Sequence, residues 1–591
     1  MRIRLPKIAL LILLLAAAII SSSCQSATEP AKQSSQELPR ERVAGTRGGS
    51  LVYRLTSPPK TFNYLMVSDE YSFTVAFYLM SGRLAEFDHD TQTYRPALAA
   101  EWKLGDDGRT LDVTLRDDIK FSDGHALTAE DVLFTFQALY DERTASPTFK
   151  DAMTIGGRPI EVSVIEARRL RLVFPEAVAT PENYLSNLAV LPKHVLEGDL
   201  KRGTLRDRYS LSEEPNKIVT AGAFIVESSA PGERVTLKRN PFYWKKDSAG
   251  TELPYLDTLT LEVVGDQNAA LTRLTQGALN IVDRIRPTDY SALRGGGGGG
   301  QVRAYDLGPG LTTDHLWFNL NEGEENGKPV VDPVKRAWFS DVRFRRAVAY
   351  AVDRESIATS VLQGLATPLY GFVSPGNKAW AATDVPRTEY NLDKARALLS
   401  EAGFQLRGSK DAPELLDSKG NRVEFTLIVP VENEARKGMG AIIQEDLSRL
   451  GIKVTVAPVE FQALTARWQQ SKDYDAILLG TSVTEPDPSS YVNYLISSSP
   501  TRPWQPKKPA PTEAWEKQLD ELLTTQAHER DAARRKALFR DAQIILAEQL
   551  PVIPIVARHI ISAANSRVRN YRPSTIVPYS LWNAEELFVN K

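Results

Sequence analysis

The residues of this 591-residue chain that could do chemistry are few and lie far apart in the sequence. Cys24 is the only cysteine, so the chain can form neither an internal disulfide nor a metal site built from several thiolates. No G-x-S-x-G, H-E-x-x-H or Gly-Lys-Ser/Thr motif occurs. Isolated surface residues are the simplest interpretation of the six histidines, which are His89, His125, His194, His315, His528 and His559. The sequence therefore favours a protein that is not an enzyme and needs no cofactor and no metal, the alternative being a catalytic site assembled from distant residues.

Cys24 stands directly after a segment that is typical of an export signal. Arg2, Arg4 and Lys7 precede the apolar run IALLILLLAAAII (8–20), which is short for a membrane-spanning helix. Residues 1–23 resemble a bacterial lipoprotein signal peptide, in which the cysteine that follows is acylated, although Ser21 stands where that signal usually has Leu. The alternative is an ordinary signal peptide with a cysteine nearby by chance.

Residues 24–47, rich in Ser, Gln, Glu, Pro and Gly, are predicted to form a flexible tether, because such a composition cannot bury enough apolar surface to offset its conformational entropy. The rest of the chain is nearly neutral, with 72 Lys and Arg against 74 Asp and Glu, which argues against a nucleic-acid partner. Its length indicates more than one domain, and no second long apolar run suggests a membrane span.

The elements that would position a site alternate between strand and helix. GDDG (105–108) is a turn signal between two extended runs, and the alternation over 111–115 predicts a strand with one buried face. Thr128 and Asp131 have the spacing of a capping box at the start of a helix. Farther along, strands and helices alternate in both halves, which is typical of α/β lobes. The six glycines at 295–300 lack a following helix, which favours a surface loop over a phosphate-binding turn.

Several stretches, taken in order, resemble the extracellular solute-binding proteins of family 5, which serve peptide-type ABC importers. They are SPPKTFNYL (57–65), LAAEWKLGDDGRTLDVTLRDDIKFSDGHALTAEDVLFTF (98–136), FSDVRFRRAVAYAVDRESI (339–357), NLDKARALLSEAGF (391–404) and AQIILAEQLPVIPI (542–555).

The resemblance implies an α/β fold of the two-lobe, type II periplasmic-binding-protein kind with an additional domain inserted in the first lobe. The expected first lobe is discontinuous (48–90, 215–310 and 556–591), the inserted domain covers 91–214 and the second lobe covers 311–555.

One stretch departs from the family pattern, LLGTSVTEPDPSSYVNYL (478–495). In characterised peptide binders, an aspartate at the position of Thr484 pairs with the α-ammonium group of the peptide. Either Glu485 or Asp487 takes over this role, or the protein does not hold a free peptide N-terminus, because a hydroxyl cannot neutralise an ammonium ion. The simpler alternative is that 485–488 form only a rigid loop. Weaker candidates for ligand contact are Ser68, Asp69, Trp380, Ser482 and Tyr491.

The resemblance implies a monomeric, exported protein, anchored by lipid to a bacterial membrane in the periplasm or on the outer face of the cytoplasmic membrane. It would carry a peptide or similar small molecule to the permease subunits of an importer. A carrier for a sugar or another non-peptide solute, and a receptor that presents its ligand to a membrane sensor, are the alternatives.

Overall fold

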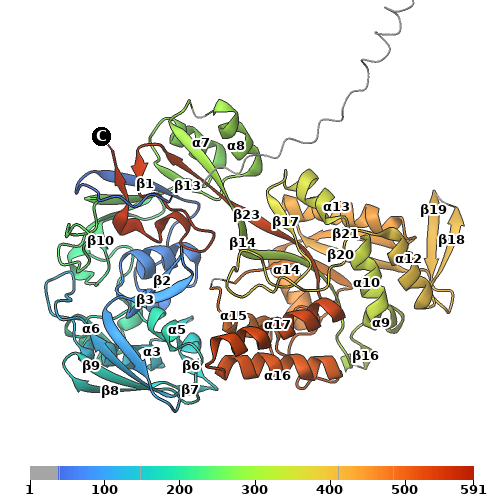
Figure 1. Ribbon diagram of the computed structural model, residues 1–591, viewed down its shortest axis with the longest axis horizontal. Helices are drawn as coiled ribbons and strands as arrows, with labels where there is room; N and C mark the ends of the chain where they lie inside the picture. Colours follow the sequence, from blue (N-terminus) through green and yellow to red (C-terminus); the bar gives the residue numbers. More distant parts are fainter. Residues whose placement is uncertain are drawn as a thin grey trace, which may run out of the picture. The chain divides into compact units, whose positions relative to one another are not determined.

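The computed structural model describes residue 38 and residues 40–590, apart from 147, 298, 326, 410 and 484. A single large sheet runs through residues 50–565, and Figure 1 shows two of its strands, β14 and β23, side by side along its middle. Its strands, in spatial order, are β10 (Phe224–Ala230), β11 (Arg234–Arg239), β12 (Thr258–Val263), β1 (Ser50–Leu55), β13 (Ile281–Asp283), β23 (Ile553–Asn565), β14 (Val302–Phe318), β22 (Ala476–Thr481), β20 (Glu424–Pro430) and β21 (Lys453–Val459). A short strand, β17 (Ala366–Pro368), also pairs with β23.

The two ends of this sheet form two lobes, and β14 and β23 pass through both. In the first lobe, β1 lies parallel to β12 and β13, and in the second β20 lies parallel to β21 and β22. The last residue of β13, Asp283, lies opposite Ser562 of β23, and the last residue of β22, Thr481, lies opposite Thr313 of β14. The carboxyl ends of the parallel strands of the two lobes therefore face each other across the middle of β14 and β23.

The middle of the two crossing strands is irregular. Their register shifts between Asp306 and Pro309 and again between Pro309 and Thr313. Pro309 has no N–H to donate, and Gly308 adopts a positive φ of 84°, which costs little without a Cβ. Fewer regular ladder bonds make this segment the natural place for a bend between the lobes.

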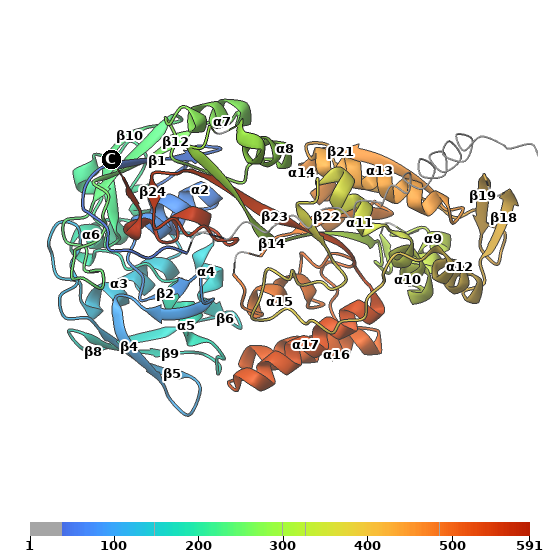
Figure 2. The same ribbon diagram turned by 45° about the horizontal axis from the view of Figure 1, so that its top comes forward.

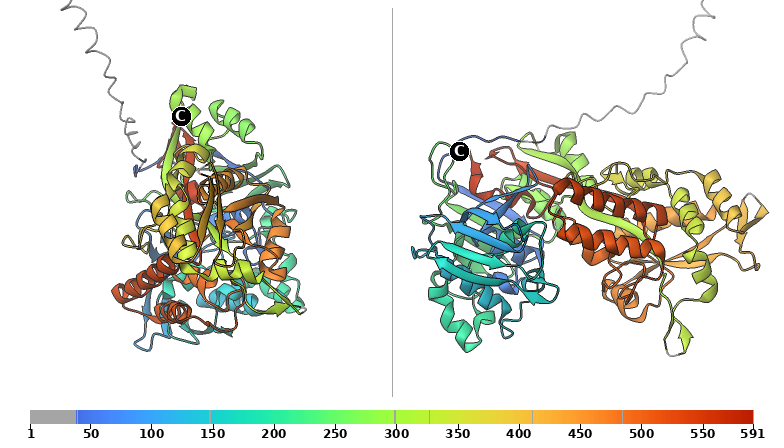
Figure 3. Two further views of the ribbon diagram at one scale, coloured as in Figure 1. Left: turned by 90° about the vertical axis from the view of Figure 1, so that its right-hand side faces the viewer. Right: turned by 60° about the horizontal axis from the view of Figure 1, so that its bottom comes forward.

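The second lobe packs helices on both faces of its sheet. Leu316 and Phe318 of β14 belong to one core and Trp317 to the other, as expected from the alternation of side chains along a strand. The helices of this lobe include α9 (Pro333–Ser340), α10 (Val342–Ala351), α12 (Leu392–Glu401), α13 (Glu434–Ser448), α14 (Phe461–Ala466) and α15 (Ser489–Leu495). Two more, α16 (Ala514–His528) and α17 (Ala532–Gln549), lie side by side, as Figures 2 and 3 show. A hairpin of β18 (Gln405–Ser409) and β19 (Ala412–Leu416) completes the lobe.

Between β1 and β10, the chain forms a separate four-stranded antiparallel sheet, which matches the expected insertion. Its strands, in order, are β4 (Ala99–Leu104), β5 (Thr110–Leu115), β9 (Arg169–Val173) and β8 (Glu161–Glu166). The hairpin predicted around 105–108 is confirmed by the pairing of β4 with β5. The capping box predicted for Thr128 and Asp131 is also confirmed, at the start of α3 (Ala129–Tyr140). Two further helices are α5 (Pro181–Ser186) and α6 (Lys193–Arg202).

The rest of the first lobe surrounds its half of the large sheet. The helical segment α2 (Glu70–Ser72) continues into a π-helix over Phe73–Leu79, and β2 (Ala85–Asp88) pairs with β3 (Thr93–Pro96). Helices α7 (Gln267–Thr275) and α8 (Pro287–Ala292) pack on a core that includes Leu274 and Tyr290. Near the C-terminus, β24 (Val568–Arg569) pairs with β25 (Phe588–Val589).

Two expectations about local structure are corrected. Residues 40–47, predicted to belong to the tether, lie against the C-terminal segment, where the backbone of Val43 exchanges two hydrogen bonds of 2.9 Å with the side chain of Asn570. His315 is fully buried, and burial lowers its pKa to about 4, so it is not a surface residue. The signal peptide and Cys24 lie outside the described residues. Within residues 40–590, no helix is both long and apolar enough to cross a bilayer.

Candidate functional site

The facing strand ends define the candidate site. In open α/β sheets, ligands bind beyond the carboxyl ends of the strands, and here two such edges oppose each other. On the second-lobe edge, two large apolar side chains are exposed, Val431 after β20 (42%) and Phe461 after β21 (43%). They lie near each other, because the backbone N–H of Phe461 donates to Glu432 at 3.2 Å. Residues 482, 483 and 485–488 follow β22 and belong to the same edge.

A cavity of about 20 Å³ opens where Glu485 and Pro486 meet the first lobe. Its lining combines segments that are distant in sequence and consists of Phe77, Tyr78, Arg83, Phe87, His89, Ser186, Glu485, Pro486, Ile576 and Val577. This volume is enough for about one water molecule, so a larger solute fits only if the lobes separate. The cavity lies at a junction whose parts a hinge could move apart.

Glu485 is the acidic residue of this cavity. Its side chain is half-buried, and burial followed by the charge of Asp487 raises its pKa to about 7, against opposing effects of Asn187 and Arg83. Among the described residues, no ion pair with Glu485 is formed, and the raised pKa has the sign expected of a carboxylate that lacks a close cation. Glu485 can therefore accept a cationic group.

Asp487 has a different environment, because it already has a cation. Arg535 of α17 donates to its two carboxylate oxygens at 2.8 and 2.9 Å, and both side chains are buried. Burial alone would raise the pKa of Asp487, but the hydrogen bonds and the charge of Arg535 hold it below its ordinary value. Asp487 also accepts a hydrogen bond from the backbone N–H of Ser489, the first residue of α15, at 2.9 Å. Its charge is thus compensated within the protein.

Two aromatic candidates pack around this ion pair. Tyr491 is 2% exposed and contacts Phe539 with ring centroids 5.4 Å apart, while Asn377 donates to its hydroxyl at 3.3 Å. Trp380 is half-buried, and the guanidinium of Arg535 lies 5.0 Å from its ring centroid. Both side chains pack on the same hydrophobic core of the second lobe, and this packing accounts for their positions.

The remaining candidates lie elsewhere along the edge. Ser482 is exposed, and its hydroxyl lies 3.1 Å from that of Thr312 in the crossing strand. Thr484 lies outside the described residues. Asp69 caps α2 by accepting from the backbone N–H of Ser72 at 2.9 Å, and Ser68 before it is exposed. They lie beside the first-lobe edge, because Arg284, which follows β13, donates to Glu70 at 3.0 Å. Ser482, Ser68 and Asp69 do not line the cavity of Glu485.

The sequence reasoning missed Arg83, which lies in the same cavity as Glu485. Its guanidinium lies over the rings of Phe77 and Tyr78, at 5.3 and 5.0 Å from their centroids. Its Nε is buried and has no hydrogen-bond partner among the described residues. The available signal was a lone charge within the apolar run FTVAFYLMSGRLA (73–85), since such a charge must find a partner.

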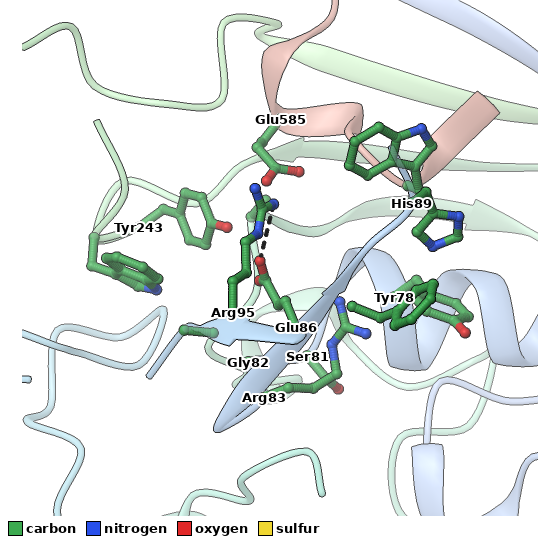
Figure 4. Close-up of a pocket in the computed structure, with 14 residues that line it drawn as sticks. Tyr78, Ser81, Gly82, Arg83, Glu86, His89, Arg95, Tyr243 and Glu585 are labelled. Carbon is green, nitrogen blue, oxygen red and sulfur yellow. Dashed lines mark hydrogen bonds and ion pairs between the residues drawn. The ribbon is translucent and has the colours of Figure 1, made fainter. Parts of the chain in front are cut away.

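Arg83 also lines a second, more enclosed cavity of about 30 Å³, which Figure 4 shows. There its side chain lies between Glu86 and Tyr78. The carboxylates of this cavity have other cations: Lys245 lies 2.5 Å from Glu86 and 2.9 Å from Glu585. Burial alone would raise the pKa of Glu86, but the charges of Lys245, Arg83 and Arg95 lower it to about 2.

The second lobe also contacts the inserted domain directly, through α16, α17 and the turn between them. His528 lies 3.2 Å from Glu176, and Arg530 donates to the backbone carbonyl of Asp106 at 2.8 Å. Arg535, besides holding Asp487, donates to the hydroxyl of Thr180 at 2.6 Å. These contacts join the second lobe to the inserted domain.

Two lobes with opposed strand ends, a hinge of two crossing strands and an inserted antiparallel domain define a binding protein of the type II periplasmic fold, as the sequence predicted. The profile of the bacterial extracellular solute-binding proteins, family 5 (middle region), matches residues 93–502. The chain belongs to this family, whose members are substrate-binding proteins that work outside the cytoplasm.

Similar proteins agree with this assignment. The chain is 30% identical to a probable ABC transporter-binding protein of Deinococcus radiodurans over 71% of each chain. It is 29% identical to the oligopeptide-binding protein AppA of Bacillus subtilis over 82% of this chain and 83% of AppA. The structure of AppA in complex with a nonapeptide superposes with a TM-score of 0.66 over 92% of this chain and 100% of AppA. A probable deoxycholate-binding periplasmic protein, YgiS of Escherichia coli, is 27% identical over 86% of this chain and 88% of its own.

Proposed function

We propose that this protein is the solute-binding component of an ABC importer, which encloses a peptide or a similar small molecule between its lobes and delivers it to a membrane permease. The observation that carries the proposal is the pair of opposed strand ends around a hinge, with Glu485 at their junction. Solute contacts with both lobes would stabilise the closed arrangement, which the permease recognises. The protein itself carries out no reaction, and hydrolysis of ATP belongs to another subunit.

The anchor for a free peptide N-terminus is assigned to Glu485. Asp487 is the less suitable candidate, because the ammonium group of a solute would have to compete with the bidentate contact of Arg535. Glu485 lines the interlobe cavity and its carboxylate lacks such a contact. An ammonium ion bound there would favour the charged carboxylate and lower its pKa. The exposed Val431 and Phe461 offer apolar contact to the rest of the solute.

Native mass spectrometry tests the proposal. The protein is incubated with a pool of random di- to pentapeptides, desalted under mild conditions and weighed, and retained peptides are then identified. We expect the bound peptides to be intact. The wild type should retain peptides with a free amino terminus in preference to N-acetylated peptides, and Glu485→Gln should show no such preference. Retention of acetylated and free peptides to the same extent by the wild type contradicts the assignment of Glu485, and recovery of cleaved peptides contradicts a purely binding function.

A non-peptide solute is the second candidate, favoured by the relative that is named for deoxycholate. The same incubation with deoxycholate and with a panel of sugars decides between them, because the peptide proposal requires peptides to be the tighter ligands. For a receptor that presents its ligand to a membrane sensor, the solute-binding result would be the same, and the distinguishing measurement is uptake of labelled solute into cells with and without the protein.

We further propose that Cys24 is acylated and holds the protein, as a monomer, on the outer side of a bacterial membrane. An alkyne-tagged fatty acid fed to expressing cells should label the wild type and not Cys24→Ala. The variant should also appear in the soluble exported fraction. Label on the variant, or a wild type free of label, contradicts the lipid anchor.

A further inference from the structure

We propose that Arg83 is the carboxylate-binding residue of the interlobe site, so that Arg83 on the first lobe and Glu485 on the second hold the opposite charges of one solute. This inference rests on the proposed function and deepens it, because it assigns the class of solute: a molecule with an anionic group as well as a cationic one.

The first argument is that, among the described residues, Arg83 forms no ion pair. The buried Nε has no hydrogen-bond partner among the described residues, and an unsatisfied buried donor carries a desolvation cost that a ligand can remove. Two nearby acidic groups are paired with other cations: Lys245 bridges Glu86 and Glu585, and Arg95 contacts Glu86 at 3.4 Å. Among the described residues no carboxylate forms an ion pair with Arg83, although its charge acts on the pKa values of Glu86 and Glu485.

The second argument is the position of the guanidinium. Its carbon lies over the rings of Phe77 and Tyr78, at 5.3 and 5.0 Å from their centroids, and these contacts hold the group in place without using its N–H donors in an ion pair. An arginine held in this way suits the planar, two-oxygen geometry of a carboxylate. Figure 4 shows the side chain reaching into the cavity beside Tyr78.

The third argument is the position of Arg83 relative to Glu485. Both line the same small interlobe cavity, from different lobes, and the positive charge of Arg83 acts on the pKa of Glu485. A solute with an anionic and a cationic group would give each charge a partner and would bridge the lobes. A solute with one charge would leave the other half of the site uncompensated, which disfavours closure.

The experiment compares two pools of random tripeptides, one with free carboxyl termini and one with amidated termini, mixed in equal amounts and offered to the protein in native mass spectrometry. We expect the wild type to retain the acid form over the amide by roughly 10- to 100-fold, the range for a hydrogen bond to a charged group. Arg83→Met should reduce this ratio to about one, and Arg83→Lys should keep part of it. Arg206→Met, which changes an exposed arginine outside both cavities, is the matched control and should retain the wild-type ratio.

Circular dichroism and thermal melting establish that each variant is folded, and Arg83→Gln replaces Arg83→Met if the latter is not. Two results overturn the role of Arg83 and leave the binding function standing. One is retention of both pools with no preference for the acid form, and the other is a preference that persists in Arg83→Met and Arg83→Gln. If the wild type retains neither pool, the peptide-binding function and the role of Arg83 fail together. A preference lost equally in Arg206→Met would also overturn the assignment.

Discussion

The ion pair between Asp487 and Arg535 should contribute to stability rather than to solute selectivity. Asp487→Asn keeps the shape of the side chain and removes its charge, which leaves a buried guanidinium without a counterion. Breaking a buried pair in this way typically costs about 3–5 kcal/mol. The remaining hydrogen bonds of Arg535, to Thr180 at 2.6 Å and to the backbone carbonyl of Gln526 at 3.0 Å, place the expected loss at the lower end, about 3 kcal/mol.

The assay is urea unfolding followed by tryptophan fluorescence, with Asp384→Asn as the matched control. Asp384 pairs with Arg540 of the same helix, α17, at 3.0 Å, but both side chains are exposed, so its loss should be small. The double variant Asp487→Leu with Arg535→Met should regain much of the stability, because it removes both charges. Folded Asp487→Asn should prefer free-amine peptides over acetylated peptides to the same extent as the wild type. A loss of stability no larger than that of Asp384→Asn would falsify this account.

Three further outcomes are expected. The pKa of Glu485 is raised from 4.5 to about 7 in the folded protein, so its contribution to stability falls as the pH rises through this window. Glu485→Gln should therefore have a higher urea midpoint than the wild type above pH 7 and the same midpoint near pH 4.5. An equal increase at both pH values contradicts the raised pKa as the cause. Lys245→Met should lose about 3 kcal/mol in thermal unfolding, since it strands the buried carboxylates of Glu86 and Glu585, and an unchanged midpoint argues against that network. Thr128→Ala should lose about 1 kcal/mol through the capping box of α3, whereas Thr128→Ser should not.

The local elements of this protein could be predicted well from its sequence. The hairpin of β4 and β5 follows from the Asp-Gly turn signal and the alternating side chains, and the start of α3 follows from the spacing of Thr128 and Asp131. The family motifs supplied the two-lobe fold and the inserted domain. Such features depend on residues that are near one another in the chain, so that their pattern can be recognised without knowing the fold.

Which charges are available to a solute was decided only by the tertiary structure. Glu485 and Asp487 are equivalent acids in a proline-rich loop when the sequence is considered alone, and Arg535 distinguishes them from 48 residues away. Arg83 lines the same cavity as Glu485 although about 400 residues separate the two in the chain. The free energy of a buried charge depends on its neighbours in space, and these come from segments whose approach is set by the packing of the two lobes.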